Sequence, residues 1–237
     1  MTDRSAAPAT GAGIDRAHRR VIFASSLGTV FEWYDFYLYG ALSTIISRQF
    51  FSGVNETTGL VFALLAFAAG FFVRPFGALV FGRLGDLVGR KYTFLVTILI
   101  MGTSTFLVGC LPSYETIGFV APVALIALRM AQGLALGGEY GGAAIYVAEH
   151  CQPHHRGSAT GWIQSSAAFG LVGALGMVLG VRTLLGEEQF FIWGWRIPFL
   201  ASAFLVGISI WMRLRLNESP AFVKMKTEGT VSKAPFK

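Results

Sequence analysis

Five ionisable side chains lie inside long apolar stretches of this sequence, and they are the groups best placed to do chemistry. They are Glu32, Asp35, Arg74, Arg129 and Glu139. Each would cost at least about 2.5–3.5 kcal/mol at the lipid-facing middle of a membrane-spanning helix. We therefore expect these side chains to face a polar interior and to pair with one another.

Three of these groups are expected near the middle of a bilayer. At about 1.5 Å per residue, Glu32 and Asp35 lie roughly 18 and 22 Å from the start of their span, at the cytoplasmic side. Arg129 lies roughly 20 Å from the start of its own span, at the outer side. Glu32 and Asp35 are three residues apart and share a helix face with Tyr39. We expect Arg129 to pair with this acidic face.

Arg74 and Glu139 form a second expected set, because both lie about 12–15 Å from the cytoplasmic side of the membrane. Equal depth alone does not show that their helix faces meet. For both sets a static salt bridge that fixes helix register stays open as an alternative to a working site.

A buried carboxylate beside a guanidinium can do transport chemistry. Burial disfavours the charged carboxylate and a nearby Arg favours it, so such a group can take up a proton and release it when its partner moves. An Arg can also hold a substrate carboxylate in a bidentate fork, and Arg74 is the first candidate. Tyr34 and Tyr39 can donate hydrogen bonds to a solute, and plain packing of these aromatic residues stays open as the alternative.

Composition places these groups in a membrane. Of 237 residues, 54% are hydrophobic and only 14% are charged, whereas a soluble domain has roughly 25% charged residues. A chain so poor in charge cannot cover a soluble surface, which excludes a cytosolic enzyme, a nucleic-acid-binding domain and a disordered chain. No cofactor is expected. No metal site is expected either, despite the short cluster of His150, Cys151, His154 and His155.

Six apolar stretches are long enough to span a bilayer. We predict spans at residues 21–46, 57–81, 92–111, 116–148, 158–181 and 195–212, with a polar tail at 1–20 and another at 213–237. Most of the 19 Lys and Arg residues fall in the two tails and the second connector, which predicts that both termini are cytoplasmic. Cys110 and Cys151 then face opposite compartments, which excludes a disulfide between them.

Two motifs resemble those of the major facilitator superfamily. The connector after the second span reads Gly82-Arg-Leu-Gly-Asp86-Leu-Val-Gly89-Arg90-Lys91, which is similar to the signature loop of that superfamily. The fourth span carries Arg129-Met-Ala-Gln132-Gly133, which looks like its second motif, and the next connector carries Glu149 and Arg156 as in sugar-transporter relatives.

Three further stretches resemble the metabolite:proton symporter family. They are Phe31-Glu32-Trp33-Tyr34-Asp35-Phe36, Gly137-Gly138-Glu139-Tyr140-Gly141-Gly142 and Gly194-Trp195-Arg196-Ile197-Pro198-Phe199. The resemblance covers about residues 17–222. It implies an all-α fold, namely the six-helix N-terminal bundle of a major facilitator superfamily transporter, built as a three-plus-three inverted repeat.

The resemblance also implies roles for individual residues. Asp35 would couple protons, assisted by Glu32, with Arg129 as its partner on the fourth span. Apart from the resemblance, we expect the substrate site to include Arg74, Tyr34, Tyr39, Gln132 and Glu139. A cytoplasmic charge lock, holding the outward-open state, would comprise Gly82, Asp86, Gly89, Arg90, Lys91, Glu149 and Arg156. Anionic-lipid contact and topology are the alternative role of these basic residues.

Members of this family have twelve spans in two halves, so this chain resembles one half. The expected function is proton-coupled symport of a small organic acid or zwitterion, such as a carboxylate or a betaine, through a bacterial inner membrane. A passive facilitator or exchanger of the same fold, and a non-transporting subunit or sensor, remain as alternatives. The expected partners are the solute, protons, lipid and a C-terminal six-helix half, with no nucleic acid. Whether the reading frame continues beyond Lys237 separates a fragment from a half-length protein.

Overall fold

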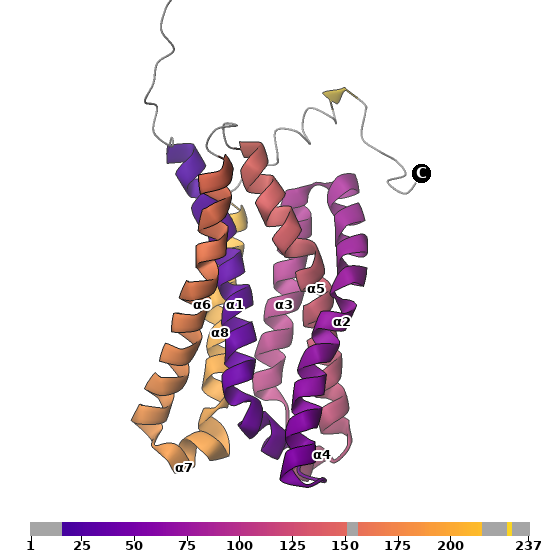
Figure 1. Cartoon of the computed structure of the whole chain (residues 1–237), viewed down its shortest axis with the longest axis vertical. Helices are drawn as coiled ribbons and strands as arrows, with labels where there is room; N and C mark the ends of the chain where they lie inside the picture. The colour runs from indigo at the N-terminus through magenta and orange to yellow at the C-terminus, as the bar shows by residue number, and fades with distance from the viewer. Residues whose placement is uncertain (1–15, 151–155, 215–226, 229–237) are drawn as a thin grey trace, which may run out of the picture.

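The computed structural model describes residues 16–150, 156–214 and 227–228. Its described elements are helical, and they form an elongated bundle (Figure 1). Six long helices run along the bundle, and short helical segments connect some of them. In chain order the elements are α1 (Arg16–Phe50), α2 (Glu56–Val88), α3 (Arg90–Cys110), α4 (Tyr114–Ile117), α5 (Val120–His150), α6 (Arg156–Leu185), α7 (Glu187–Gln189), the π-helical turn η2 (Phe190–Gly194) and α8 (Arg196–Leu214).

The predicted all-α membrane fold is confirmed, although the number of apolar spans differs from six. Among the described residues, four helices are long and apolar enough to cross a membrane, and a fifth candidate is the pair formed by residues 187–194 and 196–211, which is bent by 60°. α1 is not among them. The difference has a physical reason, because α1 carries polar groups such as Thr29, Glu32 and Asp35 that are buried inside the bundle.

The fourth predicted span, residues 116–148, is interrupted near its start. α4 ends at Ile117, and Gly118 follows with a φ of 60°, a conformation that glycine adopts readily. α5 then begins at Val120. The apolar sequence across this turn is continuous, so hydropathy alone could not reveal the break.

The helices pack most closely in three pairs, namely α2 with α5, α1 with α6, and α3 with α8. Exchanging α1 for α5, α2 for α6 and α3 for α8 maps the first pair onto the second and the third onto itself. This is the pairing that a three-plus-three inverted repeat requires. The start of α1 and the end of α8 lie at one end of the bundle, and α4 and α7 lie at the other (Figure 1).

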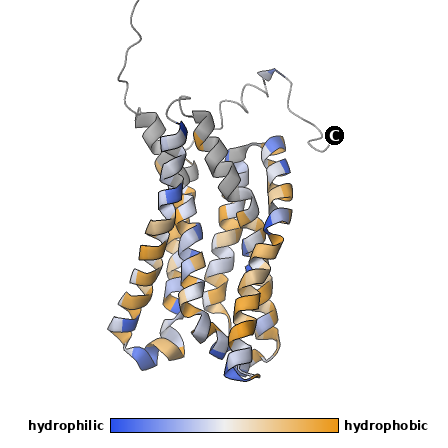
Figure 2. Ribbon diagram, viewed as in Figure 1, coloured by the Kyte–Doolittle hydropathy of each residue, from blue (hydrophilic) through white to orange (hydrophobic). Residues whose placement is uncertain are grey.

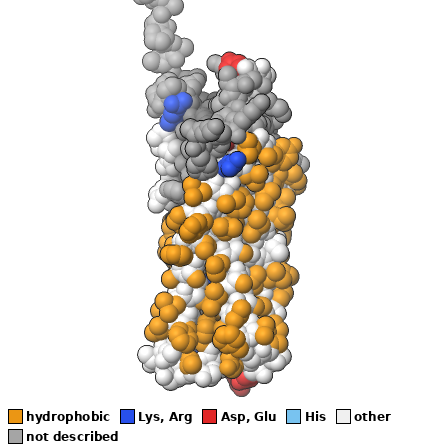
Figure 3. Space-filling view, turned by 90° about the vertical axis from the view of Figure 1, so that its right-hand side faces the viewer, with side chains coloured by type: hydrophobic (Ala, Val, Ile, Leu, Met, Phe, Trp, Pro, Cys, Tyr) orange, Lys and Arg blue, Asp and Glu red, His pale blue; other side chains and the backbone are white. Residues whose placement is uncertain are grey.

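Hydrophobic residues predominate along the length of the bundle, and hydrophilic residues gather at the end that carries α4 and α7 (Figure 2). The face in Figure 3 carries a broad hydrophobic surface. Phe72, Phe204 and Val172 are each more than 70% exposed. Exposing so many large apolar side chains to water is unfavourable, whereas the hydrocarbon core of a bilayer accommodates them.

The turn between α2 and α3 depends on Gly89, whose φ of 112° and ψ of 150° are accessible essentially only to glycine. We predict that Gly89→Ala destabilises the protein by about 1–3 kcal/mol, because the added Cβ strains this backbone. Gly82→Ala is the matched control, since a Cβ at this helical position meets nothing within 4 Å. Thermal unfolding in detergent measures both. Equal melting temperatures for the two variants would contradict the prediction.

Candidate functional site

A buried polar cluster from three helices surrounds Asp35. Arg129 Nη1 lies 2.8 Å from Asp35 Oδ2. Thr105 Oγ1 and Gln132 Nε2 donate to Asp35 Oδ1 at 3.0 and 3.1 Å. Asp35 and Arg129 are each 3% exposed, and Gln132 is 2% exposed. The predicted pairing of Arg129 with the acidic face of α1 is therefore confirmed.

The helices that supply this cluster explain why these residues meet. Asp35 comes from α1, Thr105 from α3, and Arg129 and Gln132 from α5. Arg129 and Gln132 are three residues apart and share one face of α5. Gln132 Nε2 also lies 2.6 Å from Thr105 Oγ1, which closes a network over the carboxylate. The three donors together engage both oxygens of the Asp35 carboxylate.

The sequence did not indicate Thr105. Its only local signal is a polar run at residues 103–105 inside an apolar span. Thr105 Oγ1 also lies 3.0 Å from the carbonyl oxygen of Met101, a contact within its own helix. Because a helical Thr can satisfy its hydroxyl in this way, the residue type alone does not predict a partner on another helix.

Arg129 has hydrogen-bond donors that its contact with Asp35 does not use. Its Cζ lies 4.0 Å from the centre of the Tyr39 ring, so the guanidinium is held by a cation–π contact as well as by Asp35. Its Nε and Nη2 atoms, and Gln132 Oε1, are buried and have no hydrogen-bond partner within the described residues. An arginine with free donors can change partner when Asp35 is neutralised.

A small cavity extends the cluster toward Arg74 and Glu32. Its lining includes Glu32, Asp35, Arg74, Arg129 and Gln132, with a volume of about 20 Å³. That is room for one water molecule. Arg74 was expected to pair with Glu139. The structure gives Arg74 and the two acids of α1 a common cavity. The pair with Glu139 stays a prediction, because the side chain of Glu139 lies outside the described residues.

Aromatic rings line the same cavity on the α1 and α2 side. Phe36, Phe67 and Phe71 contribute to its lining, and their ring centres lie 5.0–5.7 Å apart. Arg74 Cζ lies 4.1 Å from the centre of the Phe71 ring. Arg74 Nε is buried and has no hydrogen-bond partner in the described part of the chain. The cavity thus combines a cation with an unused donor, carboxylates and aromatic faces.

The two tyrosines predicted to bind substrate make hydrogen bonds to the protein backbone. Tyr34 donates to the carbonyl oxygen of Pro198 at 2.8 Å and does not line the cavity. Tyr39 donates to the carbonyl oxygen of Ala63 at 2.9 Å, and its ring lies against Arg129. The Tyr34 hydrogen bond therefore joins α1 to α8. The Tyr39 ring packs against the face of the Arg129 guanidinium and so helps to position the ion pair. Their roles toward a solute stay predictions.

The residues of the predicted charge lock lie at the end of the bundle where α1 begins and α8 ends. Gly82 and Asp86 are exposed near the end of α2, and Arg156 is exposed at the start of α6. Lys91 Nζ donates to the carbonyl oxygen of Leu214 at 3.0 Å, which joins α3 to α8. The side chains of Arg90 and Glu149 lie outside the described residues, so the lock stays a prediction.

Metal-ligand types do not cluster in the described ranges. No group of three or more His, Cys, Asp and Glu side chains is placed there to hold a metal ion. Cys110 is a free, exposed cysteine at the end of α3. Three members of the short His and Cys cluster, Cys151, His154 and His155, fall outside the described residues.

The family model for "Sugar (and other) transporter" matches residues 21–235. Among curated proteins, the chain is 43% identical over 204 residues to the proline/betaine transporters of Salmonella typhimurium and Escherichia coli, which covers 86% of this chain and 41% of each relative. It is 42% identical over 221 residues to an inner membrane metabolite transport protein of Escherichia coli, covering 93% of this chain and 50% of the relative. The chain thus spans about half the length of the curated relatives it matches.

Solved structures share the fold at low sequence identity. The proton:xylose symporter XylE bound to 6-bromo-6-deoxy-D-glucose superposes with a TM-score of 0.80 at 14% identity, covering 92% of this chain and 48% of that one. The inward-open conformation of the xylose transporter XylE from E. coli gives a TM-score of 0.74 at 16% identity, covering 92% and 52%. At such identity the likeness establishes the shared helical architecture.

Proposed function

Because this chain belongs to the sugar (and other) transporter family and forms the N-terminal half of a major facilitator superfamily transporter, we propose that the whole protein couples proton movement to the transport of a small organic acid or zwitterion. Solute transport, not enzymatic catalysis, is the activity of this family. Proton coupling, the solute class and alternating access are the proposed parts.

The observation that carries the proposal is the buried Asp35–Arg129 pair and its opening onto a cavity with two more ionisable groups. Protonating Asp35 removes the charge that holds Arg129 at 2.8 Å. Arg129 then has every donor available for another acceptor. A site that binds the proton and the solute through one shared arginine couples them thermodynamically, because each changes the affinity for the other.

The solute class follows from the chemistry of the cavity. A carboxylate suits Arg74, whose Nε has no hydrogen-bond partner among the described residues. A cationic or methylated ammonium end suits the aromatic rings of Phe36, Phe67 and Phe71. The printed names of relatives fit this chemistry, since they include proline/betaine, glycine betaine/proline/ectoine/pipecolic acid and shikimate transporters. Gln132, which lines the cavity, remains a proposed solute ligand. Tyr39, Glu139 and Tyr34 remain proposed members of the solute site of the whole transporter.

Transport needs a pathway that one six-helix bundle cannot enclose. We place the second wall in a C-terminal six-helix half that closes over the cavity of α1, α2 and α5. Rocking of the two halves would expose the site to each side of the membrane in turn, with Asp86, Arg90, Glu149 and Arg156 holding the outward-open state. Both termini of this half would lie in the cytoplasm of a bacterium.

The test is solute uptake into vesicles that contain the full-length transporter of which this chain is the N-terminal half. An inward proton gradient should drive labelled glycine betaine or proline above its external concentration, and a protonophore should abolish that accumulation. Equilibration without accumulation would indicate a passive facilitator. Absence of both flux and binding, across a panel of carboxylates and zwitterions, would indicate a protein that does not transport.

We predict that Arg74→Gln weakens solute binding. Losing a charge-assisted hydrogen bond worth about 1.5–3 kcal/mol should raise KM about 10- to 100-fold. The proton gradient should still drive accumulation at saturating solute, because Asp35 and Arg129 remain. Arg83→Gln is the matched control, since Arg83 is an exposed arginine farther along α2. Similar KM values for the two variants would remove Arg74 from the solute site.

A further inference from the structure

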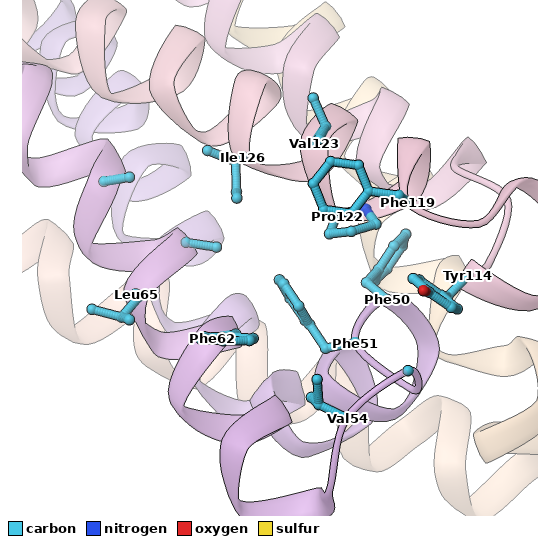
Figure 4. A pocket seen from close by; sticks show the side chains of 13 residues that line it. Phe50, Phe51, Val54, Phe62, Leu65, Tyr114, Phe119, Pro122, Val123 and Ile126 are labelled. Carbon is cyan, nitrogen blue, oxygen red and sulfur yellow. The ribbon is translucent and has the colours of Figure 1, made fainter.

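An apolar groove lies at the α4 end of the bundle, separate from the polar cavity. It has a volume of about 390 Å³ and lies where the end of α1, the first half of α2, α4 and the start of α5 meet. Figure 4 shows side chains of these elements around an open space. The lining residues are Phe50, Phe51, Gly53, Val54, Phe62, Leu65, Ala66, Ala69, Tyr114, Phe119, Pro122, Val123 and Ile126.

The chemistry of the lining decides what this groove can hold. Tyr114 carries the only polar side-chain group among the lining residues. Sites for small polar molecules add several placed donors and acceptors to an apolar wall. Burying a charged or zwitterionic solute here would leave its polar groups without partners, at a cost of several kcal/mol. The groove therefore suits an apolar occupant and does not suit the transported solute.

The position of the groove on α2 identifies the side of the bundle that it faces. A buried stripe of small residues, including Gly59, Ala63, Gly70 and Gly77, runs along this helix. Successive residues lie about 100° apart around an α-helix. This spacing puts the polar-cavity residues Phe67, Phe71 and Arg74 on one flank of the stripe, and the groove residues Phe62, Leu65 and Ala69 on the opposite flank.

The groove continues into the exposed hydrophobic surface of the bundle. Phe119 is 75% exposed and Leu65 57% exposed, and both line the groove. Their neighbour Val120 is 62% exposed without lining it. The groove thus opens onto the apolar surface that a bilayer covers, on the flank of α2 away from the polar cavity.

We propose that this groove holds the acyl chain of a membrane phospholipid. The occupant follows from the apolar lining, from the continuity with the lipid-facing surface and from the position opposite the polar cavity. Lipid tails are as apolar as the lining, so the preference for the groove must come from van der Waals packing of the chain between α2, α5 and the aromatic rings. A bound chain would thereby fill a gap beside the α2–α5 contact.

A photo-crosslinking experiment distinguishes the possible occupants. p-Benzoyl-phenylalanine replaces Phe119 in the full-length transporter in vesicles of phosphatidylethanolamine and phosphatidylglycerol, and mass spectrometry identifies what it captures on illumination. The same probe at Val120 is the matched control, because it samples ordinary lipid contact at the next residue, where α5 begins. We expect phospholipid adducts at Phe119 at about ten times the Val120 yield, which corresponds to about 1.4 kcal/mol.

Filling the groove supplies the second comparison. Ala69→Phe places a ring in the groove and should lower the Phe119 adduct yield to the Val120 level. Ala68→Phe adds the same ring at an exposed position that does not line the groove and should leave the yield unchanged. Equal yields at the two probe positions would overturn the proposal. Capture of the C-terminal half or of a second copy at Phe119 would also overturn it, and neither comparison depends on which solute is transported.

Discussion

Asp35→Asn is expected to abolish uphill accumulation of solute while leaving exchange of solute across the membrane intact. The Asn amide does not bind and release a proton as a carboxylate does, so the proton gradient can no longer drive solute movement through this site. Its amide oxygen can still accept the hydrogen bonds from Thr105 and Gln132, which lie 3.0 and 3.1 Å from Asp35 Oδ1. The pathway should therefore stay assembled and move solute down its gradient.

Two uptake assays measure this effect in vesicles that contain the full-length transporter. One follows accumulation driven by an imposed proton gradient, and the other follows exchange of labelled for unlabelled solute at equal concentrations. Glu187→Gln is the control, because Glu187 is an exposed acid at the far end of the bundle, paired with Arg182. Proton-driven accumulation that survives in Asp35→Asn would remove Asp35 from the coupling mechanism.

A double-mutant cycle separates coupling from stability in the same site. Removing one partner of a buried ion pair costs about 3–5 kcal/mol, because the remaining charge is left without its counter-charge. Asp35→Asn should thus lower the melting temperature through Arg129. Arg129→Gln in the Asp35→Asn background should restore much of the stability without restoring accumulation. A double variant no more stable than Asp35→Asn alone would show that the pair has no special role beyond general packing.

The centre of the site could be predicted from sequence because of the cost of charge in lipid. Asp35 and Arg129 lie in apolar stretches at similar depth, and few groups can neutralise them there. Depth is fixed by counting residues along a helix, whereas helix rotation is fixed by packing between helices. This is why counting residues placed Arg74 at a depth but did not indicate that it shares a cavity with Glu32 and Asp35 of α1.

Local backbone changes were harder to predict than the long helices. The turn at Gly118 and the bend of 60° between η2 and α8 both lie in apolar sequence. Hydropathy is continuous across them, and a bend there depends on how neighbouring helices pack. Trp195, at the second of these bends, is fully buried and packs against Phe50 of α1 and Phe199 of α8.

Gly133→Ala is expected to prevent α2 and α5 from packing and thereby to destroy the site. A Cβ on Gly133 would lie 1.8 Å from the carbonyl oxygen of Gly70 and 2.5 Å from its carbonyl carbon. Backbone atoms cannot rotate away as a side chain can, so the helices must separate. Overpacking of this kind costs about 3 kcal/mol or more. Arg129 lies one turn before Gly133, so the same shift displaces it from Asp35.

Gly176→Ala on α6 is the matched control, because a Cβ there meets nothing within 4 Å. It should not destabilise the protein, because inside a helix alanine is more favourable than glycine by about 0.5–1 kcal/mol. Thermal unfolding and the fraction of monodisperse protein after detergent extraction measure both variants. Gly133 and Gly176 are each followed by another glycine four residues later, so sequence spacing alone predicts similar costs for the two substitutions. Because only Gly133 lies against the backbone of another helix, a near-normal melting temperature for Gly133→Ala would mean that α2 and α5 are farther apart in the membrane than this packing requires.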